Sequence, residues 1–154
     1  MKSNLAVFFA SGFYSGFAPF APGTFGSLVG STMVYVLFHF ALTTNPWILI
    51  ALSILSFLIG AWAIKNLPST WVHDDQRIVI DEVLGIFISL CFVPITVQTI
   101  LLSLILFRVY DIFKPLGIRS FDNLSSDASV LLDDALAGIY ANITLHVFIL
   151  ILPI

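Results

Sequence analysis

The chain has 154 residues, of which 59% are hydrophobic and 10% are charged, with a formal net charge of −3. A soluble domain carries about 25% charged residues, and a chain this short has too much surface to cover with so few polar side chains. The composition therefore predicts a single integral membrane domain, residues 1–154, and argues against a nucleic-acid-binding protein, which needs a basic surface.

The first apolar stretch, residues 8–17, is interrupted by serines and glycines and is followed by an alanine- and proline-rich segment, residues 18–22. It has no clear small-residue cleavage pattern after a continuous apolar core, as a signal peptide would have. We expect this stretch to be retained and to form a short interfacial or re-entrant helix.

Two predicted membrane spans follow, residues 24–42 and 47–64, each close to the ~20 apolar residues that a transmembrane helix needs. Trp47 and Trp62 lie near the two ends of the second span, as interfacial anchors do. A polar loop, residues 65–77, comes next.

The apolar segment of residues 78–107 is too long for one ordinary span and carries Pro94 in its middle. Because proline breaks or kinks a helix, we expect two short helices that meet near Pro94. Residues 108–129 form a second polar region, and residues 130–152 form the last span. The fold class is thus all-α, a polytopic membrane bundle of about four to five membrane-embedded helices plus the N-terminal helix.

The charged residues are confined to particular connections between the predicted spans. None lies in the turn of residues 43–46, around Pro94 or after Asp134. If the spans alternate in direction, all six Lys and Arg residues share one face, which the positive-inside rule assigns to the cytoplasm. We expect the functional site on that face.

Five carboxylates lie at or beside the cytoplasmic ends of the apolar segments: Asp81, Glu82, Asp111, Asp133 and Asp134. One explanation is that they complement helix dipoles. It suits the two at the start of the last span, fits Asp81 and Glu82 less well because three apolar residues (78–80) precede them, and does not account for Asp111 at the end of a helix. The other is a metal site. Oxygen ligands without nearby His or Cys favour Mg²⁺, which would relieve the repulsion among the acids.

Basic residues and a helix start accompany these acids. Arg108, Lys114 and Arg119 are candidates to hold a phosphate, or else to anchor the chain at the membrane surface. Thr24 and Ser27 follow a Pro-Gly turn, where they could contact phosphate or cap the helix. Cations and carboxylates together at headgroup depth suggest phosphoryl chemistry on a phosphorylated lipid.

Four motifs occur in a characteristic order: Pro-Gly-Thr-Phe-Gly-Ser (22–27), Ile-Asp-Glu-Val-Leu-Gly (80–85), Phe-Arg-Val-Tyr-Asp-Ile-Phe-Lys-Pro (107–115) and Leu-Asp-Asp-Ala-Leu-Ala-Gly (132–138). Together they resemble the phosphatidylglycerophosphatase A family over residues 17–141. The resemblance implies Mg²⁺-dependent hydrolysis of phosphatidylglycerophosphate to phosphatidylglycerol and phosphate, at the cytoplasmic side of a bacterial inner membrane. It assigns the acidic site to the five carboxylates, and phosphate contacts to Arg108 and Lys114.

The chain departs from the family pattern at residues 126–129, Ser-Asp-Ala-Ser, where family members usually carry a Gly-Gly pair and a further glycine. Because glycine lets the backbone bend and approach phosphate closely, this loop could alter rate or substrate preference. Every acidic residue implied by the resemblance is nevertheless present.

Several alternatives stay open at the level of sequence. The reaction could be direct hydrolysis, with Glu82 as general base, or could pass through an aspartyl-phosphate. Rival functions are a phosphatase for another phospholipid monoester, a non-catalytic lipid-binding scaffold and a cation-transport subunit. A transport subunit should place ionisable residues near mid-membrane, and a scaffold would not need five acids. The sequence does not indicate an oligomeric state.

Overall fold

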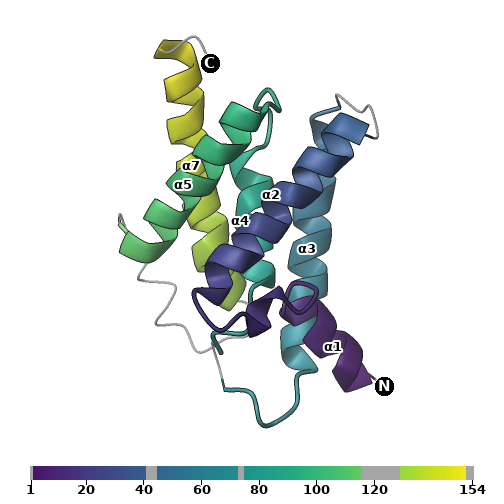
Figure 1. The fold of residues 1–154 in the computed structure, drawn as a ribbon. Helices are drawn as coiled ribbons and strands as arrows, with labels where there is room; N and C mark the ends of the chain where they lie inside the picture. The colour runs from purple at the N-terminus through teal and green to yellow at the C-terminus, as the bar shows by residue number, and fades with distance from the viewer. Residues whose placement is uncertain (1, 41–44, 73–74, 116–128, 152–154) are drawn as a thin grey trace.

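The structure is a computed structural model that describes residues 2–40, 45–72, 75–115 and 129–151. Within these ranges it is entirely helical and contains no strand (Figure 1). In chain order its elements are α1 (Lys2–Ala10), the 3₁₀ turn η1 (Ser15–Phe17), α2 (Pro22–Phe40), α3 (Trp47–Lys65), α4 (Ile80–Ser89), α5 (Val97–Phe113) and α7 (Ser129–Ile151).

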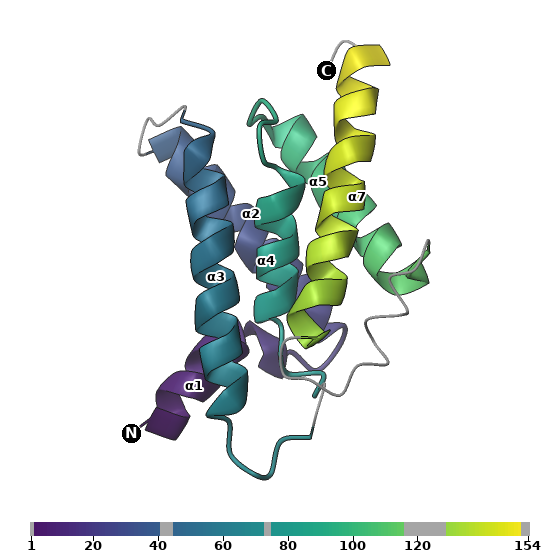
Figure 2. The same cartoon turned by 180° about the vertical axis from the view of Figure 1, so that it is seen from behind.

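Helix α4 is the central element of the bundle. It packs against α2, α3, α5 and α7, and the view from behind shows it between α3 and α7 (Figure 2). Eight of its ten residues are buried, although at 1.5 Å per residue it is only about 15 Å long, half the thickness of a bilayer core. A helix this short can lie within the bundle because the surrounding helices, and not lipid, cover its sides.

The C-terminal end of α4 stops inside the bundle and has its backbone carbonyls satisfied by α7. Asn142 Nδ2 donates to Ser89 O at 3.0 Å and to Cys91 O at 2.9 Å. The Ser89 and Ser103 hydroxyls form a further hydrogen bond, 2.5 Å between their oxygens, that joins α4 to α5. A helix end within a membrane needs such partners because no water is present to replace them.

Three of the described helices, α2, α3 and α7, are long and apolar enough to cross a membrane. The chain is therefore an integral membrane protein, but the predicted count of four to five membrane-embedded helices is not confirmed, because α4 and α5 are not among these three. The predicted break near Pro94 is confirmed, with α4 ending at Ser89 and α5 beginning at Val97.

Helix α5 continues past the predicted end at Phe107 and ends at Phe113. The charges of residues 108–129 predict a polar region that begins at Arg108. In the fold these charges are neutralised in place, since Arg108 Nη1 lies 2.6 Å from Asp111 Oδ2 one turn later. The pair therefore belongs to the helix instead of ending it.

The N-terminal helix is displaced from its predicted position at residues 8–17. It spans Lys2–Ala10, and the chain then turns through left-handed backbone, with φ of 51° at Gly12 and 69° at Tyr14, before η1. Val79 N donates to Ala10 O at 2.8 Å, so this segment holds the chain just before α4. Whether α1 lies at the interface or re-enters the membrane stays a prediction.

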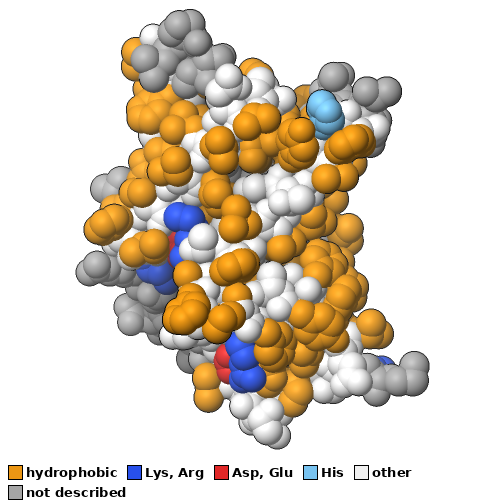
Figure 3. Space-filling model, in the orientation of Figure 1, with side chains coloured by type: hydrophobic (Ala, Val, Ile, Leu, Met, Phe, Trp, Pro, Cys, Tyr) orange, Lys and Arg blue, Asp and Glu red, His pale blue; other side chains and the backbone are white. Residues whose placement is uncertain are grey.

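The charged side chains of the described ranges lie toward one end of the bundle. Helices α2, α4 and α7 begin at that end, and α3 and α5 finish there (Figure 1). Above it, the face that carries α2 and α5 is covered by hydrophobic side chains (Figure 3). The sequence prediction that the ionisable residues share one face of the bundle is consistent with this arrangement.

Candidate active site

A polar cavity of about 400 Å³ opens at the charged end of the bundle, where four helices converge. The start of α2, the first turn of α4, the last turns of α5 and the second turn of α7 all contribute to it, as does the segment before α4. Its lining residues are Ala21, Pro22, Gly23, Asp75, Gln76, Ile78, Asp81, Glu82, Arg108, Asp111, Lys114, Asp133 and Asp134.

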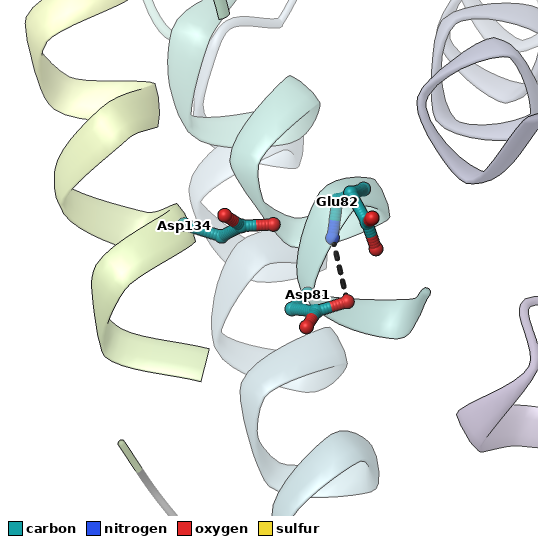
Figure 4. Close-up of side chains that lie close together, drawn as sticks. All are labelled: Asp81, Glu82 and Asp134. Carbon is teal, nitrogen blue, oxygen red and sulfur yellow. Dashed lines mark hydrogen bonds between the residues drawn. The ribbon is translucent and has the colours of Figure 1, made fainter. Parts of the chain in front are cut away.

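Three of the carboxylates form a compact cluster in this cavity, which we call the acidic triad: Asp81, Glu82 and Asp134. One oxygen from each lies within 4.8 Å of the others (Figure 4). Asp81 and Asp134 are buried, and Asp81 Oδ1 accepts a hydrogen bond from Glu82 N at 3.0 Å. Glu82 Oε2 is buried with no hydrogen-bond partner among the described residues.

Buried carboxylates at this separation repel one another strongly, and an unpartnered buried oxygen is costly. A divalent cation would remove the repulsion, and a water molecule beside it could donate to the unpartnered oxygen of Glu82. The donors are all carboxylate oxygens, the ligand type that Mg²⁺ and Ca²⁺ prefer, so the acidic triad could hold a metal ion of this hard class.

The other two carboxylates are engaged by cations. Arg108 Nη1 lies 2.6 Å from Asp111 Oδ2 and 3.7 Å from Glu82 Oε1. Lys114 Nζ donates to Asp133 Oδ2 at 2.6 Å. The five predicted acids therefore divide into three that lie together and two that fix the position of a basic side chain at the edge of the triad.

The positions at which α4 and α7 begin change which acids can interact with a helix dipole. Asp81 and Glu82 lie in the first turn of α4, where the helix dipole favours an anion, because residues 78 and 79 precede the helix instead of belonging to it. Asp133 and Asp134 lie beyond the first turn of α7, which starts at Ser129 and contains no acid there. The dipole explanation suited the second pair and is wrong for it, because those two side chains lie a turn into the helix.

Lys114 owes its position to an unusual backbone. It follows the last residue of α5 with φ 44°, a left-handed conformation that costs a non-glycine residue roughly 1–2 kcal/mol. Lys114 N donates to Tyr110 O at 2.8 Å, which completes the helix end. The turn brings the ammonium group to Asp133 of α7. The strained backbone of Lys114 therefore positions a basic side chain at the edge of the acidic triad.

Helix α2 contributes backbone to the cavity. It begins at Pro22, so Thr24 lies within the first turn and does not cap the helix, and the cavity lining includes neither Thr24 nor Ser27. The Ser27 hydroxyl is fully buried and donates to Gly23 O at 2.9 Å. Their predicted contact with phosphate stays a prediction, and Arg119 lies outside the described residues.

Gly23 is required by the site. A Cβ added there would collide with Glu82 Oε1 and would lie 3.0 Å from Arg108 Nη1. We therefore expect Gly23→Ala to displace both side chains and to reduce turnover about a hundredfold, with little change in melting temperature because only side-chain ends must move.

Gly16→Ala provides the contrast to this variant, because its Cβ would meet the backbone carbonyl of Arg77, which cannot rotate away. Gly16→Ala should lower the melting temperature. Activity and thermal unfolding measured on both variants check the distinction, and a Gly23→Ala enzyme with full activity would contradict it.

Sequence reasoning missed one wall of the cavity, formed by Asp75 and its neighbours in the segment before α4. Asp75 accepts two hydrogen bonds from the Arg77 guanidinium, at 2.8 and 2.6 Å, and these hold the pKa of Asp75 below its ordinary value. The guanidinium carbon of Arg77 also lies 4.1 Å from the centroid of the Trp71 ring. The available sequence signal was the spacing of Asp75 and Arg77, two residues apart in the predicted polar loop of residues 65–77.

Comparison with known proteins gives a consistent result. The model of the family described as phosphatidylglycerophosphatase A matches residues 8–149. Two relatives named phosphatidylglycerophosphatase A come from Haemophilus influenzae, 40% identical over 86% of this chain and 81% of the relative, and Escherichia coli, 35% identical over 89% and 79%. A Bacteroides thetaiotaomicron protein provisionally named phosphatidylinositol-3-phosphatase is 40% identical over 94% of both chains. No solved structure matches the chain.

Proposed function

Because the chain belongs to the phosphatidylglycerophosphatase A family, we propose that it hydrolyses phosphatidylglycerophosphate to phosphatidylglycerol and phosphate in a Mg²⁺-dependent reaction. Membership makes the chain a phosphatase of membrane phospholipids. The observation that carries the finer assignment is the acidic triad beside two carboxylate-held cations, in one cavity at the end of a membrane bundle.

The acidic triad is the proposed Mg²⁺ site, since its oxygens are clustered, Asp81 and Asp134 are buried, and Arg108 approaches Glu82 Oε1 only to 3.7 Å. When bound, Mg²⁺ would polarise the phosphate group and a water molecule. We narrow the predicted set of five ligands to Asp81, Glu82 and Asp134. Asp111 and Asp133 instead fix the cations that meet the substrate.

The chain's own groups account for binding and proton movement. Arg108 and Lys114 present positive charge to the phosphate oxygens, and the start of α2 adds the positive end of its dipole. Glu82 accepts the proton of the attacking water through its unpartnered oxygen as the phosphorus–oxygen ester bond breaks. The protonated Glu82 then returns this proton to the alcohol oxygen of the lipid, which leaves as the free alcohol, and the carboxylate is regenerated.

An aspartyl-phosphate route is the alternative mechanism, in which a carboxylate attacks phosphorus first. Rapid acid quenching of a single turnover distinguishes the two routes. Direct attack by water leaves no acid-stable phosphoenzyme, whereas the covalent route leaves a phosphorylated protein.

A second candidate substrate is a phosphoinositide monoester. The Bacteroides relative that covers most of this chain has a name that refers to phosphatidylinositol 3-phosphate. The acidic triad and the two cations would contact the terminal phosphate and not the alcohol that carries it, so both lipids are compatible with the site.

Phosphate release by the purified protein in detergent decides between these substrates. We expect release from phosphatidylglycerophosphate with Mg²⁺, at least about tenfold faster in kcat/KM than from phosphatidylinositol 3-phosphate, and no release in EDTA. Release that persists in EDTA would overturn the metal assignment. A reversed substrate order would support the second candidate.

We further propose that the cavity faces the cytoplasm of a bacterial inner membrane. The lysine and arginine residues of the described ranges lie at the same end as the cavity, and the positive-inside rule places such an end in the cytoplasm.

A further inference from the structure

A second hollow runs along the membrane-facing side of the bundle between α2 and α5. It has a volume of about 380 Å³ and is lined largely by apolar side chains, among them Leu28 and Tyr35 of α2 and Val97, Leu101 and Leu104 of α5. No charged residue contributes to it. The two helices lie side by side on the face shown in Figures 1 and 3, with apolar side chains between them.

This groove and the catalytic cavity are lined by successive parts of the same two helices, α2 and α5. On α5, Arg108 of the cavity is followed, back along the same helix face, by Leu104, Leu101 and Val97 at spacings of four, three and four. On α2 the first residue of the groove, Leu28, comes five residues after Gly23 of the cavity. From Arg108 to Val97 the distance is about 17 Å at 1.5 Å per residue, close to the depth of one leaflet.

One polar group in the groove lacks a partner. The hydroxyls of Ser27 and Thr32 donate to the carbonyls four residues earlier in α2, at 2.9 and 2.8 Å. Ser31, which is 6% exposed, does not, and its Oγ is buried without a hydrogen-bond partner among the described residues. A buried hydroxyl left unpaired in this way calls for an acceptor supplied by whatever fills the groove.

We propose that the α2–α5 groove holds an acyl chain of the phospholipid substrate, with the Ser31 hydroxyl donating to the ester carbonyl of that chain. The inference rests on the proposed function, because it joins the groove to a cavity that receives the phosphorylated headgroup. A lipid ester is apolar along its chain and carries an acceptor at the end nearer the headgroup, and Ser31 lies between Gly23 of the cavity and Tyr35 at the far end of the groove on α2.

Leu101→Trp tests the groove by filling it. Kinetics should be measured with phosphatidylglycerophosphate bearing long acyl chains and with a short-chain analogue of the same headgroup. We expect the KM for the long-chain lipid to rise on the order of tenfold while the value for the short-chain analogue changes less than about twofold, because only the long chain reaches the tryptophan.

Val36→Trp is the matched control. Val36 lines a different apolar hollow, of about 640 Å³, that includes Leu52 of α3 and no residue of the catalytic cavity. An equal rise in KM for both chain lengths in Leu101→Trp, or the same selectivity in Val36→Trp, would overturn the groove assignment. If the wild type hydrolyses neither lipid, both the proposed function and the groove assignment fail. An active wild type without altered selectivity in Leu101→Trp refutes the groove alone.

Ser31→Ala tests the hydrogen bond by itself. Kinetics should be compared between ester-linked phosphatidylglycerophosphate and an ether-linked analogue with the same headgroup. We expect KM for the ester-linked lipid to rise about fivefold, as the loss of one hydrogen bond predicts, and KM for the ether-linked lipid to stay unchanged, because it has no carbonyl to accept that bond. Equal effects on the two lipids, or none on either, would remove Ser31 from the proposal. Ser53→Ala is the control, because the Ser53 hydroxyl donates to Leu49 O within its own helix, α3, and Ser53 does not line the groove.

Discussion

Replacing Asp134 with asparagine should reduce phosphate release on the order of a thousandfold and leave the fold intact. Asp134 is the member of the acidic triad contributed by α7, and its carboxylate faces Asp81 and Glu82 across the helix interface (Figure 4). An amide nearly matches the carboxylate in shape but carries no negative charge, so the cluster would lose much of its attraction for a divalent cation. Initial-rate measurements at saturating Mg²⁺ check this.

Thermal unfolding separates metal binding from structural damage in the same variant. Mg²⁺ should raise the melting temperature of the wild type, because an ion that binds only the folded state stabilises that state. The melting temperature of Asp134→Asn should change little when Mg²⁺ is added. Without Mg²⁺ the variant should be at least as stable as the wild type, since one of three clustered negative charges is gone. A variant that unfolds early even without the metal would point to a packing role for Asp134 instead.

Asp75→Asn is the matched control for charge. Asp75 lines the same cavity, but Arg77 engages its carboxylate and it is not part of the acidic triad. We expect this variant to keep the Mg²⁺-induced rise in melting temperature and to lose less than about tenfold in rate. A loss as large as that of Asp134→Asn would mean that cavity charge in general, and not the triad, controls activity.

Gly138→Ala should both destabilise the protein and inactivate it. A Cβ at Gly138 of α7 would lie 2.6 Å from the backbone oxygen of Gly85 in α4, so the two helices would have to separate. Overpacking at a site that cannot yield costs about 2 kcal/mol. Because the same interface brings Asp134 to Asp81 and Glu82, the separation should also open the acidic triad. Melting temperature and phosphate release measure the two effects.

Gly60→Ala is the control for this glycine. Its Cβ would approach Leu131 Cδ2 at 2.9 Å, the end of a flexible side chain that can change rotamer. We expect a small loss of stability and nearly normal activity. If Gly138→Ala proved as mild as Gly60→Ala, the close approach of α4 and α7 would not be what assembles the site.

Much of the molecule follows from the sequence. The scarcity of charge identified a membrane protein, and the long apolar segments located α2, α3 and α7 close to their observed bounds. Pro94 correctly indicated an interruption between two short helices. These features could be predicted because they depend on local composition and on the backbone, which each segment carries with it.

The acidic residues were also found from the sequence, but their division was not. Lys114 engages Asp133 nineteen positions away in another helix, and the triad joins the first turn of α4 to α7. Such pairings depend on how helices cross, and no spacing along one segment encodes that crossing. The sequence alone consequently gave all five acids the same role.

The tertiary structure also decided where the helices around the site begin and end. The N-terminal helix lies at Lys2–Ala10 instead of at residues 8–17, because the chain that follows it turns so that residues 10, 12 and 16 lie against residues 77–79, far along the chain. Helix α4 could remain short and fully embedded because α7 satisfies its end through Asn142. The sequence by itself determined which residues are available to the site and on which face of the membrane bundle they lie. Only contacts between distant segments decided which carboxylates remain open to a cation, because burial and charge pairing arise between helices and not within them.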